Sequence, residues 1–353
     1  MASGVKTRLE ADRKIRRGLA LGKYAPFHRG HQLVIETALA EMDEVVVLIY
    51  DAPDVTDIPL PVRARWLREL YPALQVIEAW EGPTQVGYTD DIMRAHERYI
   101  IDTLGISGIT HFYSSEPYGD HISRALGAVD RQVDPTRIKV PISASRIRPH
   151  PFRYRDYLDP LVYRDLITKV AVLGAPSTGK TTLCERLAQQ FHTLWMPEYG
   201  REYWAQHQIN RRLSAEQLVD IAEGHLAREE ALLLQADHYL FTDTNALTTA
   251  QFARHYHGAI PPQLAALADQ AATRYDLTLV CAADIPYEDT WDRSGDMQRR
   301  AFQQQIIADL KQREIPFTLL QGTVEARAAQ VAEILRHFRK YRNPPQPKEN
   351  VVA

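Results

Sequence analysis

The segment GAPSTGKTT at residues 174–182 places the strongest constraint on the fold of this 353-residue chain. It satisfies the pattern G-x-x-x-x-G-K-[ST], follows an apolar run that ends at Leu173, and precedes a sequence with helical periodicity. Glycines allow successive backbone N–H groups to turn toward one anion, and the N-terminus of the following helix adds positive potential. The pattern therefore predicts a phosphate-binding loop between a strand and a helix.

The residues around this loop favour a small-molecule kinase, because neither an N-K-x-D signature nor an L-S-G-G-Q segment occurs. Lys180 is expected to reach the β- and γ-phosphates, and Thr181 to bind Mg²⁺. Asp243, which follows an apolar run, is expected on the metal or the ribose, and Glu198 is expected as the base, although these two roles could be exchanged. Arg293 lies in a polar segment that could close over the site. The other residues expected to contact ATP here are Gly174, Ser177, Thr178, Gly179 and Thr182.

Apolar runs alternate with helical patterns along the chain, and this alternation favours parallel sheets covered by helices. A proline-rich stretch from Arg146 to Asp165 interrupts the alternation. We therefore predict two α/β domains at residues 18–165 and 166–342, between a flexible leader at 1–17 and a disordered tail at 343–353. Expected strands are Leu19–Leu21, Val45–Ile49, Leu74–Glu78, His111–Ser114 and Ile138–Pro141, then one from Thr168, Tyr239–Thr242, Leu277–Val280 and Phe317–Leu320.

A second unusual segment, GKYAPFHRGH, follows the first expected strand at residues 22–31. His28 and His31 are three residues apart at the expected start of a helix, so their side chains share one face. Gly30 would let a phosphate approach the backbone closely. Attack on the α-phosphate of a nucleotide needs fixed cationic or N–H donors rather than a nucleophilic side chain. The two imidazoles are therefore candidate catalytic donors; the alternative is that they are ordinary capping or surface histidines.

A third segment, ISASRIR at residues 142–148, follows the last expected strand of the first domain. The hydroxyls of Ser143 and Ser145 can cap a helix. Arg148 adds a forked donor that suits pyrophosphate. Alone, this pattern is only a weak indication of a phosphate-binding site. The indication becomes stronger because the two histidines precede it in the same expected domain.

Together, GKYAPFHRGH and ISASRIR resemble the (H/T)-x-G-H and I-S-x-T-x-x-R signatures of the nucleotidyltransferase superfamily. Joined to GAPSTGKTT, EYGREY and FTDTN, they make the chain similar to the bifunctional nicotinamide-nucleotide adenylyltransferase/ribosylnicotinamide kinases of bacteria, the NadR type. The resemblance covers nearly all of the chain, from Gly18 to Arg339. It implies a Rossmann-like first domain that adenylylates nicotinamide mononucleotide (NMN) with ATP to give NAD and pyrophosphate. It also implies a P-loop second domain that phosphorylates nicotinamide riboside with ATP and Mg²⁺.

The resemblance also implies binding residues by position. In the first domain the ATP site would comprise Gly22, Lys23, Tyr24, Ala25, Pro26, His28, Gly30, His31, Ser143, Ser145 and Arg148, with Lys23, the histidines and Arg148 taking part in catalysis. The mononucleotide pocket would be lined by Arg63, Ser114, Ser115 and Glu116. In the second domain the riboside would face Glu198, Tyr199, Gly200, Thr242, Asp243, Thr244 and Asn245, with Arg293 closing over it.

Three positions depart from the family pattern. Ser145 stands for a threonine and keeps the hydroxyl, and Asn245 stands where an acid is expected after Asp-Thr. The segment DTWDR at Asp289–Arg293 replaces D-D-G-x-R. About seventeen residues precede the first expected strand, too few for the helix-turn-helix domain of the larger members, so direct DNA binding is not expected.

The composition limits the classes of partner and the cellular compartment that we expect for this chain. The net charge of −3 gives no general attraction to nucleic acid or to an anionic membrane, and no apolar run is long enough for a membrane span. The two cysteines, Cys184 and Cys281, suit a reducing compartment. We expect a cytoplasmic homo-oligomer whose partners are ATP, nicotinamide riboside, NMN and NAD.

Two other functions remain open from the sequence. One is an adenylyl- or cytidylyltransferase for another acceptor, fused to a different nucleoside kinase, because the motifs define triphosphate chemistry better than they define the acceptor. The other is a nucleotide-sensing regulator with one inactive site. Aromatic residues that could stack on a nicotinamide ring, but are more often core residues at such spacings, are Trp80, Tyr88, Trp195, Tyr203 and Trp204.

Overall fold

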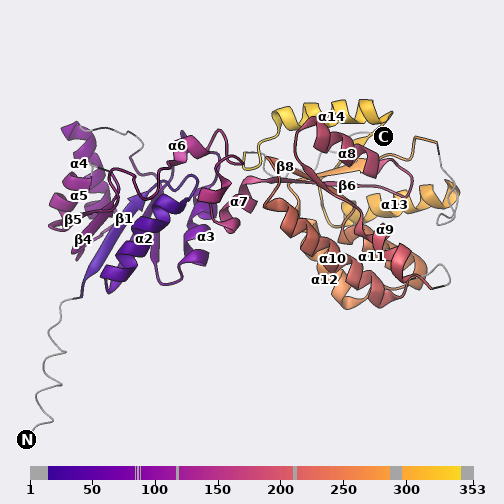
Figure 1. Cartoon of the computed structure of the whole chain (residues 1–353), viewed down its shortest axis with the longest axis horizontal. Helices are drawn as coiled ribbons and strands as arrows, with labels where there is room; N and C mark the ends of the chain where they lie inside the picture. Colours follow the sequence, from indigo (N-terminus) through magenta and orange to yellow (C-terminus); the bar gives the residue numbers. More distant parts are fainter. Residues whose placement is uncertain are drawn as a thin grey trace, which may run out of the picture. The chain divides into compact units, whose positions relative to one another are not determined.

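The structure is a computed structural model that describes residues 15–342, except 84, 86, 88, 117, 118, 210–212 and 287–295. The chain divides into two compact units between Val162 and Tyr163, inside helix α7 (Pro160–Leu166), and each unit contains a five-stranded parallel sheet (Figure 1). The predicted α/β class is confirmed. The predicted tail and nearly all of the predicted leader lie outside the described residues.

The first unit is built on a sheet with strand order β3-β2-β1-β4-β5. This is the order of the first five strands of a Rossmann fold, with β1 between β2 and β4. Its strands are β1 (Arg17–Gly22), β2 (Glu44–Tyr50), β3 (Gln75–Ala79), β4 (His111–Ser114) and β5 (Val129–Gln132). Its helices are α2 (Arg29–Glu41), α3 (Leu60–Leu70), α4 (Asp90–Arg98) running into a π-helical turn (Tyr99–Thr103), α5 (Gly119–Leu126) and α6 (Ala144–Ile147), followed by a 3₁₀ turn (Arg155–Tyr157).

The strand predicted at Ile138–Pro141 is wrong, and β5 takes its place in the sheet. The carboxylate of Asp134 accepts hydrogen bonds from the backbone N–H groups of Ile138, Lys139 and Val140 at 2.9–3.1 Å. Those donors are therefore used locally and cannot serve a strand ladder. The Ile138 side chain is 81% exposed, so its apolar character gave a false indication of burial.

The second unit is built on a sheet with strand order β10-β9-β6-β8-β7, in which β6 is central. Its strands are β6 (Thr168–Leu173), β7 (Leu194–Met196), β8 (Tyr239–Asp243), β9 (Leu277–Cys281) and β10 (Thr318–Leu320). Its helices after α7 are α8 (Lys180–Gln190), α9 (Tyr199–His207), α10 (Ala215–Leu233), α11 (Ala246–His257), α12 (Pro262–Arg274), α13 (Asp296–Gln312) and α14 (Val324–His337).

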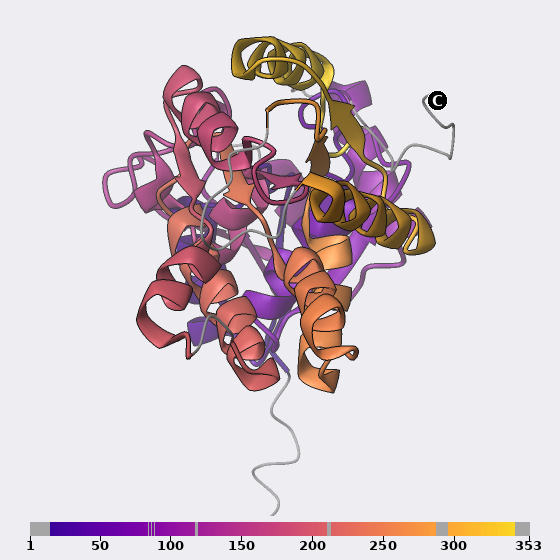
Figure 2. The ribbon, with the colours of Figure 1, turned by 90° about the vertical axis from the view of Figure 1, so that its right-hand side faces the viewer.

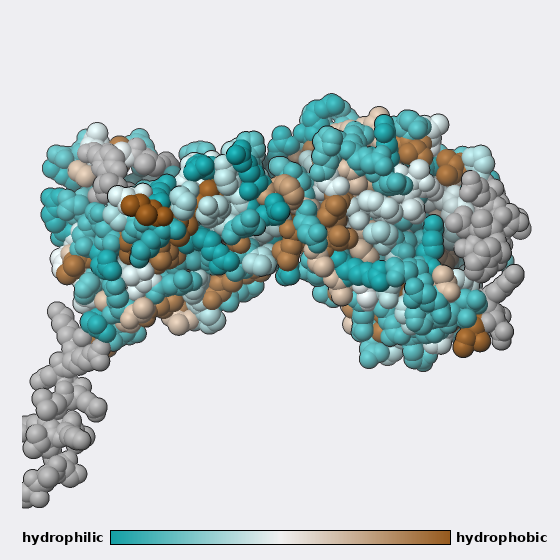
Figure 3. Space-filling model, in the orientation of Figure 1, coloured by the Kyte–Doolittle hydropathy of each residue, from teal (hydrophilic) through white to brown (hydrophobic). Residues whose placement is uncertain are grey.

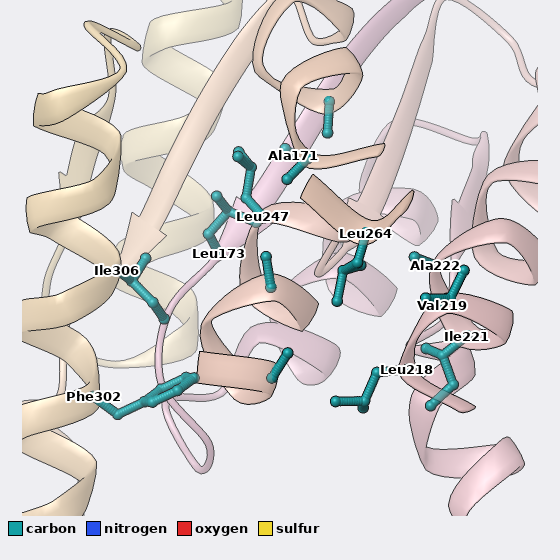
Figure 4. Close-up of a cluster of buried hydrophobic side chains, with 14 of the residues drawn as sticks. Ala171, Leu173, Leu218, Val219, Ile221, Ala222, Leu247, Leu264, Phe302 and Ile306 are labelled. Carbon is teal, nitrogen blue, oxygen red and sulfur yellow. The ribbon is translucent and has the colours of Figure 1, made fainter. Parts of the chain in front are cut away.

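Both faces of this second sheet are buried. Ala171 and Leu173 of β6 pack in a cluster with side chains of α10, α11, α12 and α13 (Figure 4). Val170 and Val172, which alternate with them, pack in a second cluster with α8 and α14. Helices therefore cover both faces of the sheet (Figures 1 and 2), and this explains why residues 170–173 of β6 form a continuous apolar run.

The surface of the described residues is mostly polar. On the face drawn in Figure 3, hydrophilic residues predominate and apolar residues appear in small groups. None of the helices within the described residues combines the length and the apolar character that crossing a bilayer requires.

Candidate active sites

The first site lies where β1 and β4 end side by side. These neighbouring strands are parallel, and the chain leaves them in different directions, toward α2 and toward α5. Such a switch point leaves a crevice at the carboxyl edge of a parallel sheet. The loop after β1 brings His28 and His31 to this crevice, and the segment after β4 brings Ser115 and Glu116.

The two histidines close the first turn of α2. Nδ1 of His28, the N-cap residue, accepts a hydrogen bond from Gly30 N at 3.1 Å, and Nδ1 of His31 accepts one from His28 N at 3.3 Å. The two rings stack with their centroids 3.7 Å apart. The pair forms a capping box in which imidazoles replace the usual hydroxyl and carboxylate side chains. The histidines are therefore capping residues and cavity residues at once.

The protonation of both rings follows from this geometry. Because each Nδ1 accepts an N–H, a neutral ring carries its proton on Nε2. Burial lowers the pKa of His28 to about 4, and the positive charge of Arg137 acts in the same direction. Burial, His28 and Arg137 likewise hold the pKa of His31 well below its usual value. At neutral pH the site therefore offers two neutral Nε2–H donors rather than imidazolium cations.

A cavity of about 210 Å³ lies against these rings. Of the residues predicted for this site, the cavity is lined by His28, Gly30, His31, Ser115, Glu116, Ser143 and Ser145. Ser143 is the N-cap of α6, but no hydroxyl caps this helix; the Oγ atoms of Ser143 and Ser145 lie 3.0 Å apart instead. The predicted capping bond is therefore wrong, and the two hydroxyls remain at the cavity wall.

Sequence reasoning missed Arg137, which also lines this cavity. Its guanidinium donates to the Glu116 carboxylate at 3.0 Å, and its backbone has a φ of +53°. The preceding Asp134 binds the N–H groups of residues 138–140 and so shapes the turn that presents Arg137. The stretch DPTRIK matches no motif that would have indicated this position.

Three predicted basic residues do not line this cavity. Arg63 is fully buried and donates to the backbone carbonyls of Ile58 (2.9 Å), Tyr50 (2.9 Å) and Lys23. It therefore holds the loops after β1 and β2 together. Arg148 donates to Ala25 O at 2.9 Å and fixes the same loop from the other side. Burial, with the charge of Arg148 acting in the same direction, lowers the pKa of Lys23.

The remaining predicted residues of the first unit build the loop or the strand ends. Tyr24 has a φ of +48°, and its ring packs edge-on against His31 with centroids 4.9 Å apart. A Cβ on Gly22 would lie 3.2 Å from the Tyr24 ring, and the peptide bond between Ala25 and Pro26 is cis. Ser114 is buried and its hydroxyl donates to Glu116 O at 3.0 Å.

The second site is the phosphate loop between β6 and α8, at the predicted position. Gly174, Ser177 and Gly179 have φ values of +139°, +57° and +79°. A Cβ on Gly174 would lie 2.8 Å from Cys281 O, so only glycine fits at that position. Gly179 is the N-cap of α8, which begins at Lys180. Thr182, also predicted to contact ATP, is exposed on the first turn of α8.

Polar side chains fix this loop and its partner acid. Thr178 Oγ1 and Lys180 Nζ both donate to Ala175 O, at 2.8 and 2.9 Å. Thr181 Oγ1 donates to Asp243 Oδ2 at 2.6 Å, which brings together the two predicted metal ligands. Asp243 is completely buried, and burial raises the pKa of its carboxyl, with Glu198 adding to the effect and Lys180 opposing it. One carboxylate and one hydroxyl suit Mg²⁺, which takes most of its other ligands from phosphates and water.

A larger cavity of about 760 Å³ begins at Thr181 and extends between the end of β7, α9 and α10. The predicted Glu198 and Tyr199 line it. The Arg228 guanidinium lies 4.0 Å from the Tyr199 ring centroid and is paired with Glu202 at 2.6 Å. The apolar wall of this larger cavity is formed by Trp195, Met196, Pro197, Ala205, Ala231 and Leu232. Glu198 also forms an ion pair with Arg201 at 3.5 Å, so this carboxylate lines the cavity and pairs with a largely exposed arginine at the same time.

Several residues predicted for the riboside lie outside this lining. Thr242 is completely buried in β8, and Thr244 donates to Asp243 Oδ1 at 3.2 Å. Asn245 is the N-cap of α11, and its Oδ1 accepts from Leu247 N at 3.0 Å. Gly200 packs on Ile221. These residues therefore support Asp243 and the neighbouring helices rather than forming the cavity wall.

The remaining predictions concern Arg293 and the aromatic residues that could stack on a ring, and only some of these residues lie in the described parts of the chain. Arg293, its segment from Asp289, and Tyr88 lie outside the described residues. Among the candidate stacking residues, Trp195 lines the larger cavity, Trp80 is 52% exposed and Tyr203 is buried in the core. Trp204 is half-buried and packs against that core.

Comparison with known proteins identifies the family. The trifunctional NAD biosynthesis/regulator protein NadR of Salmonella typhimurium (strain LT2) is 30% identical over 325 residues, which cover 85% of this chain and 77% of the relative. The chain belongs to the NadR family. A family described as an AAA domain also matches residues 169–327, the part of the chain that holds the phosphate loop.

Two solved structures of NadR proteins share the fold. One, a complex with NAD and AMP-PNP, has a TM-score of 0.54 at 21% identity and covers 95% of this chain and 99% of its own. The other, a complex with NR, has the same TM-score and identity and covers 96% of this chain and 98% of its own. The NadR fold therefore extends over both units of the present chain.

Proposed function

We propose that the chain is a two-site enzyme of NAD biosynthesis. In the first unit, ATP adenylylates NMN to give NAD and pyrophosphate; in the second, ATP phosphorylates nicotinamide riboside to give NMN. Membership of the NadR family supports the pathway. The ligands of the two related structures fit these reactions, because NAD is the product of the first, AMP-PNP is an analogue of ATP and NR is the acceptor of the second. The observation that carries the proposal is that one chain holds two separate cavities, one lined by His28 and His31 and the other beginning at Thr181 of the phosphate loop.

The first site suits adenylyl transfer. A phosphate oxygen of NMN attacks the α-phosphorus of ATP, and the bond from that phosphorus to the bridging oxygen of pyrophosphate breaks. The attacking phosphate is already ionised, so no general base is needed. The Nε2–H donors of His28 and His31 would stabilise the charge that develops on the transferred phosphoryl group and on pyrophosphate. Ser143 and Ser145 add hydroxyl donors at the cavity wall.

The second site suits phosphoryl transfer to a hydroxyl. Loop N–H groups and Lys180 would hold the triphosphate, and Thr181 with Asp243 would hold Mg²⁺, which neutralises phosphate charge. Glu198 lines the adjacent cavity with Thr181, whereas Asp243 is buried and bonded to Thr181. We therefore assign Glu198 as the base that accepts the proton of the riboside hydroxyl, and Asp243 as the metal ligand. The aromatic and apolar wall of the cavity matches a nicotinamide ring.

Product analysis tests both assignments. The protein is incubated with Mg-ATP and either nicotinamide riboside or NMN, and the products are separated by chromatography. His28→Ala should abolish NAD formation from NMN and spare riboside phosphorylation, whereas Lys180→Ala should do the reverse. Loss of both activities in each variant would contradict the two-site assignment. Turnover of a different nucleotide or nucleoside, with neither nicotinamide compound accepted, would overturn the acceptor assignment alone.

A further inference from the structure

Three buried polar side chains join the phosphate loop to the segment that follows β9. The first is Gln303 of α13, whose Oε1 accepts a hydrogen bond from Ala175 N at 2.7 Å while its Nε2 donates to Cys281 O at 3.0 Å. One amide group thus connects Ala175 of the phosphate loop with Cys281 at the end of β9. Two arginines repeat this connection, and we call the three side chains the loop clamp.

Both arginines of the clamp donate to carbonyls of the phosphate loop. Arg299, one turn before Gln303 on α13, is 5% exposed and donates through Nη1 to Ser177 O at 3.3 Å. Its guanidinium also donates to Ile285 O at 3.1 and 3.2 Å. Arg327 of α14 is 1% exposed and donates through Nη1 to Thr178 O.

The second amino group of Arg327 completes the connection. It donates to Ala282 O at 3.1 Å and to the Asp284 carboxylate. Asp284 in turn accepts a hydrogen bond from Gly322 N at 2.7 Å. All three clamp residues therefore contact both segments, although they come from two different helices.

The bonded carbonyls determine the direction of the neighbouring N–H groups. In a planar trans peptide the C=O of one residue and the N–H of the next point in opposite directions. With the carbonyls of Ser177 and Thr178 directed outward to the arginines, the N–H groups of Thr178 and Gly179 are directed to the inside of the loop. These N–H groups are the ones that a phosphate loop offers to its anion.

We propose that Arg299, Gln303 and Arg327 are positioning residues for the triphosphate of ATP, which they affect without touching it. The proposal rests on the phosphate-binding role proposed for the second unit. If the clamp sets the N–H groups in advance, binding does not have to supply the cost of ordering them. Loss of the clamp should therefore weaken ATP binding and raise KM for ATP more than it lowers kcat. A merely structural role would lower stability without this selective effect.

The test compares Arg299→Lys, Arg327→Lys and Gln303→Glu with the wild-type chain. Lysine keeps the positive charge but cannot direct two amino groups to two segments. Glutamate keeps an acceptor for Ala175 N and loses the donor to Cys281 O. Riboside phosphorylation is measured over a range of Mg-ATP concentrations, together with the thermal unfolding of each variant. Adenylyl transfer by the first unit in the same preparations reports on protein that remains intact.

Arg313→Lys is the matched control, because Arg313 directly follows the last residue of α13 and forms ion pairs, with Asp309 at 3.0 Å and with Asp269. We expect KM for ATP to rise about 10-fold in Arg327→Lys and severalfold in Arg299→Lys and Gln303→Glu, with no change in Arg313→Lys. A KM within twofold of wild type in both folded arginine variants would overturn the proposal. If Arg327→Lys does not fold, Arg299→Lys and Gln303→Glu decide the question by the same criterion.

A second measurement separates this inference from the proposed reaction. Calorimetric titration with a non-hydrolysable ATP analogue, in a His28→Ala background, reports binding at the phosphate loop without any acceptor, and Lys180→Ala verifies the site. If the wild-type chain does not phosphorylate the riboside, the proposed reaction fails, and weaker analogue binding in the clamp variants still supports the clamp. Unchanged analogue binding in those variants refutes the clamp whatever the acceptor is.

Discussion

In the proposed function, the two sites present hydrogen-bond donors to phosphate in opposite ways. In the first unit the donors are side chains, and backbone N–H groups of His28 and Gly30 hold them by donating to imidazole Nδ1 atoms. In the second unit, apart from Lys180, the donors would be backbone N–H groups, and the side chains of Arg299, Gln303 and Arg327 hold the loop that carries them. Except at Lys180, a change to a donor or loop-holding side chain should therefore act directly on the first site and indirectly on the second.

The two units also share a device, which is the bonding of arginines to loop carbonyls. Arg63 and Arg148 bind carbonyls of the loop after β1, as Arg299 and Arg327 do for the loop after β6. Both loops leave the central strand of a parallel sheet. An arginine has five N–H donors in a fixed arrangement, so one side chain can bind several carbonyls of such a loop and its neighbours.

The contrast between a side-chain site in the first unit and a backbone site in the second can be tested by mutation. The largest effect is expected for Gly174→Ala. The new Cβ would lie 2.8 Å from Cys281 O, at a φ of +139° that side chains rarely adopt. Strain and overpacking together should destabilise the second unit by about 2–4 kcal/mol and reduce riboside phosphorylation by about 100-fold or more. Adenylyl transfer should be retained, and both activities are measured in the same preparation.

Gly258→Ala provides the control for Gly174→Ala. Gly258 ends α11 in the same unit with a φ of +73°, but none of the described residues comes within 4 Å of the position that a Cβ would take there. This variant should lose about 1 kcal/mol of stability and keep its phosphorylation rate. Equal loss of rate in the two variants would show that general destabilisation, and not the loop, is responsible.

The fold and the loop positions followed from local sequence signals. The phosphate loop, its strand and helix, and the two histidines at a helix start all lie within short segments whose spacing has a direct geometric meaning. The predicted strand at Ile138–Pro141 failed because a carboxylate four to six residues earlier, on Asp134, took its N–H groups. Apolar content alone does not reveal such a competitor.

Other features depend on contacts that no local pattern encodes. Arg299 and Arg327 meet the phosphate loop from 122 and 149 residues away. Arg63 was predicted at the pocket; in the structure it is buried and donates to three backbone carbonyls, because a buried guanidinium needs several acceptors and the loop ends supply them. The sequence therefore indicated the positions of the two loops better than it indicated the residues that hold them in place.

The second-largest effect is expected on the stability of the first unit when the pH is lowered. The pKa of His28 falls from 6.5 to about 4 on folding, so between these values the unfolded chain binds more protons than the folded one. The contribution of His28 to stability is therefore complete above pH 6.5 and is lost as the pH falls toward 4, by up to about 3 kcal/mol. His31 acts in the same direction. Hydrogen exchange of β1 and β2 amides from pH 7.5 to 4.5 measures this loss.

His28→Asn is the matched variant, because asparagine caps a helix and does not titrate in this range. Its first unit should lose less stability on acidification than the wild-type unit. Identical pH dependence in the two proteins would show that His28 does not titrate as its burial implies. In the wild-type enzyme, kcat/KM for adenylyl transfer should show no inflection near pH 6.5, because the neutral ring is the donor already.

The smallest effect is expected for Gly30→Ala, the counterpart of Gly174→Ala in the first site. A Cβ on Gly30 would lie 3.0 Å from Cε1 and 3.1 Å from Nδ1 of His28, but the backbone there has no positive φ. The ring can move by a few tenths of an ångström, so stability should change by less than about 1 kcal/mol. Because that ring is the donor itself, adenylyl transfer should still fall about 10-fold, with riboside phosphorylation unchanged. An adenylyl transfer rate equal to that of the wild type would mean that the exact place of the His28 ring does not matter, and the contrast between a side-chain site and a backbone site would lose its support.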